Sequence, residues 1–193
     1  MILPAILSYL IGSIPFSYLI ARFITGKDIR GMGSGNVGAT NVMRTTGKIP
    51  GVAALLLDVL KGAGCVWLAH VLTADPTTKA VCGFMAMLGH SFPLFLGFRG
   101  GKSVATGGGA FGALVPFAML SSIGVFGIML LSFRIVSLGS VAAAAAFPLF
   151  AWLYGADKGI ILWSAISAAL IIVRHHANIA RLFQGAEPKL RRE

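Results

Sequence analysis

The sequence predicts an all-α integral membrane protein with seven transmembrane helices, some of them short or tilted, in a single polytopic domain over residues 1–193. Residues 1–21 and 103–133 contain no charged side chain. Apolar runs of eighteen or more residues are long enough to cross a bilayer about 30 Å thick. The whole chain is 56% hydrophobic and only 11% charged, which is typical of a membrane protein.

The basic residues predict the orientation of the spans. We expect apolar segments at residues 2–24, 49–72, 80–98, 103–133, 135–154 and 159–173. The connections at residues 25–48 and 99–102, the single Arg134 and the end of the chain from Arg174 are basic, whereas the other two connections carry no net charge. Basic connections face the cytoplasm in most membrane proteins. We therefore expect the N-terminus outside and the C-terminus in the cytoplasm.

Lys102 and Arg134 are both expected on the cytoplasmic side, so the chain must cross the membrane an even number of times between them. This parity requires two passes. This apolar stretch of about 31 residues spans roughly 46 Å as a helix, which is less than two full spans. Two short or tilted helices are therefore expected to share it, with breaks favoured at the glycines of residues 107–112 and at Pro116. Because the first cationic side chain is Arg22, we expect residues 1–23 to remain as the first span instead of being cleaved as a signal peptide.

A polar, glycine-rich segment interrupts the apolar chain at residues 31–48, which read GMGSGNVGATNVMRTTGK. Its glycines can bring backbone N–H groups into the concave arrangement that binds anions. Arg44 adds a planar guanidinium that suits phosphate, and the segment contains no acid. We interpret it as a phosphate-binding segment; the alternative is a flexible loop between two spans.

A second polar segment, GHSFPLFLGFRGGKSVATGGG, covers residues 89–109. Gly101 and Lys102 place an ammonium and flexible backbone at the start of a helix, which also suits phosphate. The letters GKS do not form a P-loop, because that motif needs a glycine at position 96 and a preceding strand, and Leu96 stands there. His90 lies inside the third span, as either a packing histidine or a site residue.

The third segment, RHHANIARLFQGAEPK, covers residues 174–189 at the end of the last span. On a helix, His175 and Asn178 share a face and can point at one ligand, whereas His176 faces elsewhere. The alternative for the whole segment is a basic, amphipathic end resting on anionic lipid, and we favour it for Arg181, Lys189, Arg191 and Arg192. Ser137 begins the sixth span and offers either one hydroxyl to a site or an ordinary helix-end serine.

Two further pairs of polar residues have structural interpretations. Asp58 and Lys61 share a helix face within the second span, where isolated charges are costly, so we expect them to pair with each other or with another group of the bundle. His70 and Asp75 have the H-x4-D spacing of a group of glycerolipid acyltransferases. They lie in an outer connection, away from the three polar segments, and we expect no catalytic role for them.

These residues leave several function classes open. An enzyme of lipid-phosphate chemistry and a small-anion transporter or channel both fit three cationic segments on one face; a scaffold subunit leaves the glycine-rich segments unexplained. The formal net charge of +10 does not indicate nucleic-acid binding, because the basic residues lie mostly at span ends.

The three segments resemble the signature segments of the bacterial acyl-phosphate:glycerol-3-phosphate acyltransferase family, which makes lysophosphatidic acid in the first acylation of phospholipid synthesis. The similarity covers GSGNVGATN with Arg44, then GH, FP and GGKSVAT, and finally His175, Asn178-Ile179 and the G-x-E-P of residues 185–188. The segments follow in the family's order, and its seven-helix, N-terminus-out topology is similar to the one expected here. Ser103 stands where glycine is common, and His176-Ala177 replace a frequent Arg-Glu pair.

The resemblance implies an acyl phosphate donor and a glycerol 3-phosphate acceptor, with inorganic phosphate released and neither acyl-CoA nor carrier protein used directly. It implies an enzyme of the bacterial cytoplasmic (inner) membrane with its active site on the cytoplasmic face. Its partners are these two substrates and membrane lipid; we expect no metal, no cofactor, no nucleic acid and no obligate protein partner.

The resemblance also implies roles for individual residues. The implied catalytic residues are Ser34, Lys102, His175 and Asn178, and the implied substrate-binding residues are Gly33, Gly35, Asn36, Gly38, Thr40, Asn41, Arg44, His90, Gly101 and Ser137. The loop backbone would hold one phosphate, the cations would neutralise charge, and an apolar groove would take the acyl chain. His175 and Asn178 would orient the acceptor hydroxyl or the carbonyl, while the donor phosphate takes the hydroxyl proton.

Overall fold

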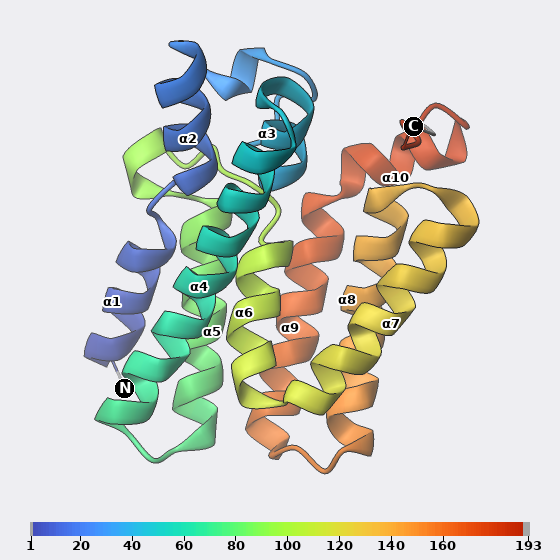
Figure 1. The fold of residues 1–193 in the computed structure, drawn as a ribbon. Helices are drawn as coiled ribbons and strands as arrows, with labels where there is room; N and C mark the ends of the chain where they lie inside the picture. The colour runs from blue at the N-terminus through green and yellow to red at the C-terminus, as the bar shows by residue number, and fades with distance from the viewer. Residues whose placement is uncertain (1, 191–193) are drawn as a thin grey trace. The chain divides into compact units, whose positions relative to one another are not determined.

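The computed structural model describes residues 2–190, and every regular element in that range is a helix (Figure 1). Arg191 and Arg192, expected to rest on anionic lipid, lie outside the described residues. The chain divides after Leu114 into two compact units. The expectation of one domain over the whole chain stays a prediction.

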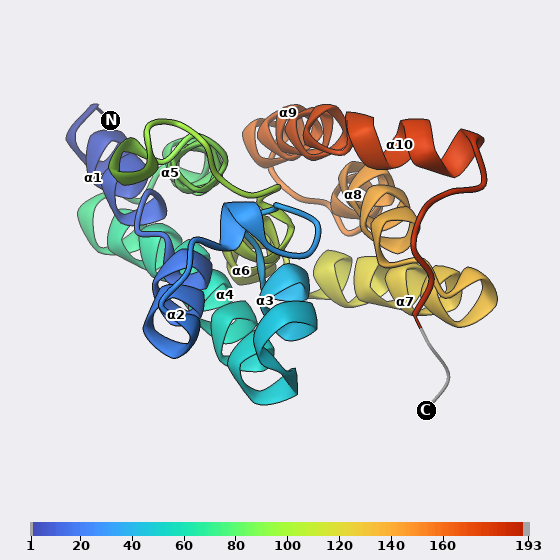
Figure 2. The same ribbon diagram turned by 90° about the horizontal axis from the view of Figure 1, so that it is seen from above.

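The first unit contains six α-helices and two short 3-10 helices. They are α1 (Ile2–Gly12), α2 (Phe16–Thr25), η1 (Ile29–Gly31), α3 (Ala39–Thr46), α4 (Lys48–Leu72), α5 (Pro76–Ser91), η2 (Leu94–Leu96) and α6 (Val104–Leu114). Helices α1, α4, α5 and α6 pack against one another as a bundle (Figure 2). Helices α2 and α3 pack against each other and against α4.

The second unit contains α7 (Pro116–Phe133), α8 (Val136–Leu153), α9 (Lys158–Arg174) and α10 (His176–Phe183). Helix α8 lies between α7 and α9 (Figure 2). Helix α10 follows α9 after a bend of 59° at His175 and contacts both α8 and α9. Helix α7 leaves large apolar side chains such as Leu131 exposed, as expected for a surface in contact with lipid.

Length and composition make five helical segments within residues 2–190 candidate membrane spans, or six if α9 and α10 form one bent span. The predicted segment 103–133 does contain two helices, and the break falls at Val115, immediately before Pro116. This part of the expectation is confirmed. The expected break at residues 107–112 is wrong, because these glycines lie inside α6.

Two glycines instead bring α4 and α6 into close contact. A Cβ atom on Gly62 would collide with the backbone oxygen of Thr106, and one on Gly109 would collide with that of Val59. Small residues at such crossings let helix backbones approach closely, which stabilises packing where no hydrophobic effect operates. Gly109 of α6 and Gly62 of α4 therefore serve packing between these two helices.

The first predicted span is broken, whereas its apolar composition predicts one continuous helix. Residues 2–25 form α1 and α2 with a short non-helical connection at residues 13–15. Pro15 lacks a backbone N–H and disfavours the helical conformation of the residue before it. The break leaves backbone carbonyls at this point that need hydrogen-bond donors.

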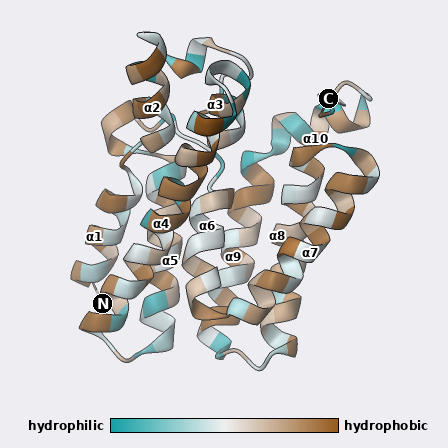
Figure 3. Cartoon of the chain, viewed as in Figure 1, coloured by the Kyte–Doolittle hydropathy of each residue, from teal (hydrophilic) through white to brown (hydrophobic). Residues whose placement is uncertain are grey.

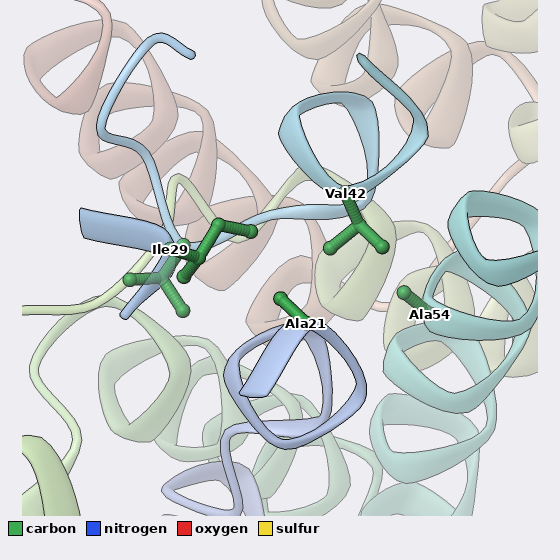
Figure 4. Packing of buried hydrophobic residues seen from close by; sticks show 5 residues of the cluster. Ala21, Ile29, Val42 and Ala54 are labelled. Atoms are coloured by element: carbon green, nitrogen blue, oxygen red, sulfur yellow. The ribbon is translucent and has the colours of Figure 1, made fainter. Parts of the chain in front are cut away.

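Polar residues gather at one end of the first unit. Apolar colouring runs along much of α4 and α7, whereas hydrophilic residues occur around α3 and on α10 (Figure 3). Beneath the polar segment, Ala21, Ile29, Val42 and Ala54 point toward one another (Figure 4), and Val37 belongs to the same buried cluster. Burying Ile29 and Val42 contributes about 1.5–3 kcal/mol each. This cluster packs the glycine-rich segment against α2 and α4.

Candidate functional site

The glycine-rich segment forms an irregular loop between η1 and α3. Gly33 and Gly35 have φ angles of 56° and 71°, in the left-handed region that favours glycine. The loop ends at Gly38, which precedes the first turn of α3. Ser34 and Thr40 are exposed, so their hydroxyls are accessible from outside the loop.

Asn41 shapes this loop from within. Its Oδ1 accepts a hydrogen bond of 2.9 Å from the Ser34 N–H, and its Nδ2 donates to the carbonyls of Met32 and Asn36, both at 3.0 Å. The side chain is buried, and a Cβ on Gly33 would collide with its Oδ1. Because its amide is used by the loop, a direct contact between Asn41 and a phosphate would require one of these bonds to break.

The two arginines beside the loop differ in their contacts. Arg30 donates from Nε and Nη2 to both carboxylate oxygens of Asp28 and donates at 3.3 Å to the Leu96 carbonyl. Hydrogen bonds from the side chain and the backbone N–H of Arg30 hold the pKa of Asp28 below its ordinary value. The Arg44 side chain is exposed and makes no hydrogen bond or ion pair with any residue between 2 and 190. Its guanidinium can therefore bind an external anion without first breaking a contact.

The second polar segment meets the first at Gly101. The Gly101 N–H donates at 3.1 Å to the His90 carbonyl. A Cβ on Gly101 would collide with the His90 ring and with the carbonyl of Val37, which belongs to the glycine-rich loop. Lys102 follows directly and is partly buried. The predicted residues His90, Gly101 and Lys102 are thus brought beside the loop in the first unit.

Ser103 adopts a backbone conformation that L-residues rarely use. Its φ angle is 60°, and its hydroxyl donates to the Met87 carbonyl at 2.6 Å and lies 2.7 Å from the Ser91 hydroxyl. These buried bonds offset the strain of the left-handed conformation. They also explain why serine is accommodated at a position where glycine is common in the family that the sequence resembles.

A buried ionic cluster lies at the break between α1 and α2. Asp58 pairs with Lys61 at 2.9 Å, and Nδ1 of His90 lies 3.5 Å from the same carboxylate oxygen. Ser17 donates to the other oxygen at 3.1 Å, and Lys61 also donates to the Ile14 carbonyl at 2.9 Å. The expectation that Asp58 and Lys61 pair is confirmed. Lys61 thereby satisfies a carbonyl that the broken helix exposes.

The same groups line a small cavity of about 10 Å³, close to the smallest volume that holds one water molecule. Sequence reasoning missed Ser17 and Ile14 as partners. The available signal was the Ser13-Ile14-Pro15 tripeptide, which predicts a helix break in an otherwise apolar span. Among residues 2–190, no three His, Cys, Asp or Glu side chains lie close enough together to form a metal site.

In the second unit, the Glu187 carboxylate binds residues of the third polar segment and the start of α8. Oε1 of Glu187 accepts from the Ser137 hydroxyl at 2.7 Å and from Nδ2 of Asn178 at 2.6 Å, while Oε2 accepts from Nε of Arg181 at 2.7 Å. Burial acts to raise the pKa of Glu187, but hydrogen bonds from Asn178, Ser137 and Arg181 prevail and lower it below its ordinary value. Glu187 was not predicted as a site residue, although it lies in the G-x-E-P motif.

His175 is buried at the junction between α9 and α10. Its Nδ1 lies 2.8 Å from the Ile171 carbonyl, and because a carbonyl only accepts, Nδ1 must carry a proton. In a neutral ring, Nε2 is then the acceptor nitrogen. His176 is exposed, and its Nδ1 lies 3.0 Å from the nearby Val173 carbonyl.

Asp75 of the H-x4-D pair is a helix cap. Its carboxylate accepts from the backbone N–H groups of Thr77 and Thr78 and from the Thr78 hydroxyl at the start of α5. The Thr78 hydroxyl and backbone bonds lower the pKa of Asp75. These contacts give Asp75 a structural role that needs no partnership with His70.

The predicted site residues fall in both units. The first unit contains Gly33, Ser34, Gly35, Asn36, Gly38, Thr40, Asn41, Arg44, His90, Gly101 and Lys102, and the second contains Ser137, His175 and Asn178. Within the first unit the two glycine-bearing segments meet at Gly101, and within the second Glu187 joins Ser137 to Asn178.

Comparison with known proteins gives one consistent result. Residues 2–185 match the family described as glycerol-3-phosphate acyltransferase. The chain is 44% identical to the glycerol-3-phosphate acyltransferase of Thermosynechococcus vestitus, covering 96% of this chain and 93% of the relative. It is 45% identical to that of Desulforamulus reducens, with 95% and 92% covered.

Solved structures agree with the sequence relatives. A crystal structure of PlsY (YgiH), an integral membrane glycerol 3-phosphate acyltransferase in its glycerol 3-phosphate form, superposes with a TM-score of 0.93 and 40% identity, covering 97% of this chain and 94% of that one. The lysophosphatidic acid form of PlsY superposes with a TM-score of 0.91, 39% identity and the same coverage.

Proposed function

Because the chain belongs to the glycerol-3-phosphate acyltransferase family, we infer that it is a multi-pass membrane enzyme that transfers a fatty acyl group to glycerol 3-phosphate and produces lysophosphatidic acid. Family membership decides between the enzyme and the anion transporter or channel in favour of the enzyme. We further propose acyl phosphate as the donor, so that inorganic phosphate is the second product.

The proposed reaction is a single acyl transfer. A hydroxyl oxygen of glycerol 3-phosphate attacks the carbonyl carbon of the acyl phosphate, the bond from that carbon to the phosphate oxygen breaks, and phosphate leaves with the hydroxyl proton. An acyl phosphate already carries a good leaving group. The protein's main tasks are then to hold two anionic substrates and to stabilise developing negative charge.

The observation that carries the proposed phosphate binding is the loop at residues 31–38 beside Arg44. Asn41 and two left-handed glycines hold the loop backbone, Ser34 and Thr40 expose their hydroxyls, and the exposed Arg44 is available to an anion. In the proposed mechanism the loop N–H groups and these hydroxyls bind one phosphate. Arg44 and Lys102 neutralise phosphate charge.

Residues of the second unit are proposed to act on the acceptor. His175 and Asn178 orient the acceptor hydroxyl or the carbonyl, and Ser137 contributes one hydroxyl. A neutral His175 with Nδ1 bound to the Ile171 carbonyl can accept a hydrogen bond at Nε2. In our proposal it orients the hydroxyl while the donor phosphate takes the proton.

We propose the bacterial cytoplasmic membrane as the location, with seven spans, the N-terminus outside and the site on the cytoplasmic face. The break at Val115 supports this number, because α6 and α7 supply the two passes that parity requires. In this proposal, five spans are the long apolar segments, a sixth is α9 continued by α10, and the seventh is α6, which has only 11 residues and is one of the short spans expected from the sequence.

The donor is tested by supplying the purified protein with either palmitoyl phosphate or palmitoyl-CoA, each with glycerol 3-phosphate, and measuring lysophosphatidic acid by mass spectrometry. We expect lysophosphatidic acid to form with palmitoyl phosphate as the donor and not with palmitoyl-CoA. Equal or faster formation from palmitoyl-CoA would contradict the proposed donor while leaving the acceptor and product in place.

A further inference from the structure

A buried acid of the first unit, Asp58, has no part in the proposed mechanism. Its side chain lies in α4 and pairs with Lys61, and its carboxylate also faces His90 of the second polar segment. We propose that Asp58 is a positioning residue for acyl transfer: through the His90 ring it holds Gly101 and the adjoining Lys102 at a fixed distance from the glycine-rich loop. This inference rests on the proposed function and adds a residue that lies outside the three polar segments.

The first contact of this arrangement joins α4 to α5. One carboxylate oxygen of Asp58 lies 2.9 Å from Nζ of Lys61 and 3.5 Å from Nδ1 of His90, and the other accepts from the Ser17 hydroxyl at 3.1 Å. Asp58 is 1% exposed and His90 is 8% exposed, so water screens the attraction between the carboxylate and a proton on Nδ1 only weakly. A carboxylate held by Lys61 and Ser17 therefore orients the imidazole ring.

The second contact joins the His90 ring to the second polar segment. A Cβ on Gly101 would collide with Nε2 of the ring and with the carbonyl of Val37. The Gly101 backbone therefore lies directly between the ring and the glycine-rich loop. Its N–H donates at 3.1 Å to the His90 carbonyl, and the Gly100 N–H donates at 3.2 Å to the Ser91 carbonyl, so the ring and the backbone of α5 both hold this segment.

These contacts couple the two segments that are proposed to bind phosphate. The cavity that Val37, Asp58 and His90 line has a volume of about 10 Å³, which leaves the ring little space in which to turn. A tilt of the ring would move Gly101, and Lys102 after it, relative to the loop. In the proposed mechanism the loop binds one phosphate and Lys102 neutralises phosphate charge. The spacing that Asp58 maintains then determines how the two substrates face each other.

The test is a kinetic comparison of Asp58→Leu/Lys61→Met with the wild-type enzyme in detergent, using palmitoyl phosphate and glycerol 3-phosphate. The double variant replaces the buried pair with apolar groups of similar size, so it leaves no unpaired charge. We expect kcat to fall about 10- to 100-fold, the effect of misplacing reacting groups. KM for each substrate should stay within about threefold, because each segment keeps its own phosphate contacts.

Asp75→Ala is the matched control for stability. Asp75 caps the start of α5, the helix whose last turn contains His90, by accepting from the N–H groups of Thr77 and Thr78. Its loss should lower Tm without changing kcat or either KM. All rates are measured well below the Tm of each variant. A low kcat for the double variant beside normal kinetics for this control separates positioning from a general loss of stability.

A second comparison tests whether Asp58 acts through the His90 ring. Leucine at position 90 has no nitrogen to face the carboxylate and fills less of the space beside Gly101, so His90→Leu should also lower kcat about 10- to 100-fold. Adding Asp58→Leu/Lys61→Met to His90→Leu should then lower kcat by no more than about a further twofold. A full further loss in the triple variant would overturn the proposal.

Two more kinetic results would also overturn it: a folded double variant that keeps kcat within about threefold of the wild type, or a loss that lies wholly in KM. If the double variant does not fold, Asp58→Glu keeps the charge but moves the carboxylate by one methylene, and it should show the same fall in kcat. Failure of this variant to fold as well would establish a purely structural role. A wild-type enzyme that makes no lysophosphatidic acid would instead overturn the proposed function.

Discussion

At the scale of single residues, Ser103 combines a strained backbone with two buried hydrogen bonds. We predict that Ser103→Ala destabilises the protein more than Ser103→Gly does. Both variants lose the hydroxyl, but only glycine relieves the positive φ angle, a difference of about 1 kcal/mol. Thermal unfolding in detergent measures the stability of each variant. An alanine variant as stable as the glycine variant would contradict this explanation of the Ser103 backbone.

Arg44 and Arg30 offer a second comparison at this scale. We predict that Arg44→Lys weakens substrate binding about tenfold, because a single ammonium replaces a planar fork that can make two hydrogen bonds to phosphate. Arg30→Lys should change substrate affinity little, since Arg30 is already engaged by Asp28. Titration of each variant with glycerol 3-phosphate and with acyl phosphate measures both. Unchanged affinity of Arg44→Lys for both substrates would contradict the bidentate role.

Some residue contacts were predictable from sequence and others were not. Charge in an apolar helix requires a partner, so the pairing of Asp58 with Lys61 followed from composition and spacing alone. The contacts of Glu187 could not be derived this way, because they join residues nine and fifty positions apart through a bend in the chain. An asparagine in a polar, glycine-rich segment suggests a ligand contact, and only the fold reveals that the Asn41 amide holds the loop.

At the scale of elements, the buried ionic cluster contacts the broken first span, since Lys61 donates to the Ile14 carbonyl and Ser17 donates to Asp58. We predict that Asp58→Asn is strongly destabilising, by about 3–5 kcal/mol, because it leaves Lys61 buried without its counter-charge. The double variant Asp58→Asn/Lys61→Met should recover part of this loss, since it removes the unpaired charge as well. The free energy of unfolding, measured for both variants, tests these two expectations. A double variant no more stable than Asp58→Asn would mean that the pair is not the source of the effect.

Sequence patterns located most helices but not the reasons for their breaks. The lengths of apolar runs placed the spans, and parity required two helices in residues 103–133, which α6 and α7 confirm. Glycine was assigned to a break because it is a poor helix former. In this protein Gly62 and Gly109 instead lie where α4 and α6 cross, a packing role that depends on a partner helix and has no local signature.

At the scale of the whole molecule, the topology makes a direct prediction. In a variant without Cys65 and Cys82, Ala74→Cys should react with a membrane-impermeant maleimide in intact cells, because it lies in the exposed connection between α4 and α5. Lys27→Cys should react only after the membrane is permeabilised, since its connection is basic and expected in the cytoplasm. The reverse pattern would invert the orientation, and labelling of both from outside would contradict the number of passes.

The central claim is acyl transfer from acyl phosphate to glycerol 3-phosphate. The most direct test measures phosphate release by the purified, detergent-solubilised protein given palmitoyl phosphate, with and without glycerol 3-phosphate, while lysophosphatidic acid is quantified in parallel. We predict release that depends on the acceptor and matches the lysophosphatidic acid formed mole for mole. A well-folded protein that released no phosphate, or released it without forming this lipid, would contradict the account.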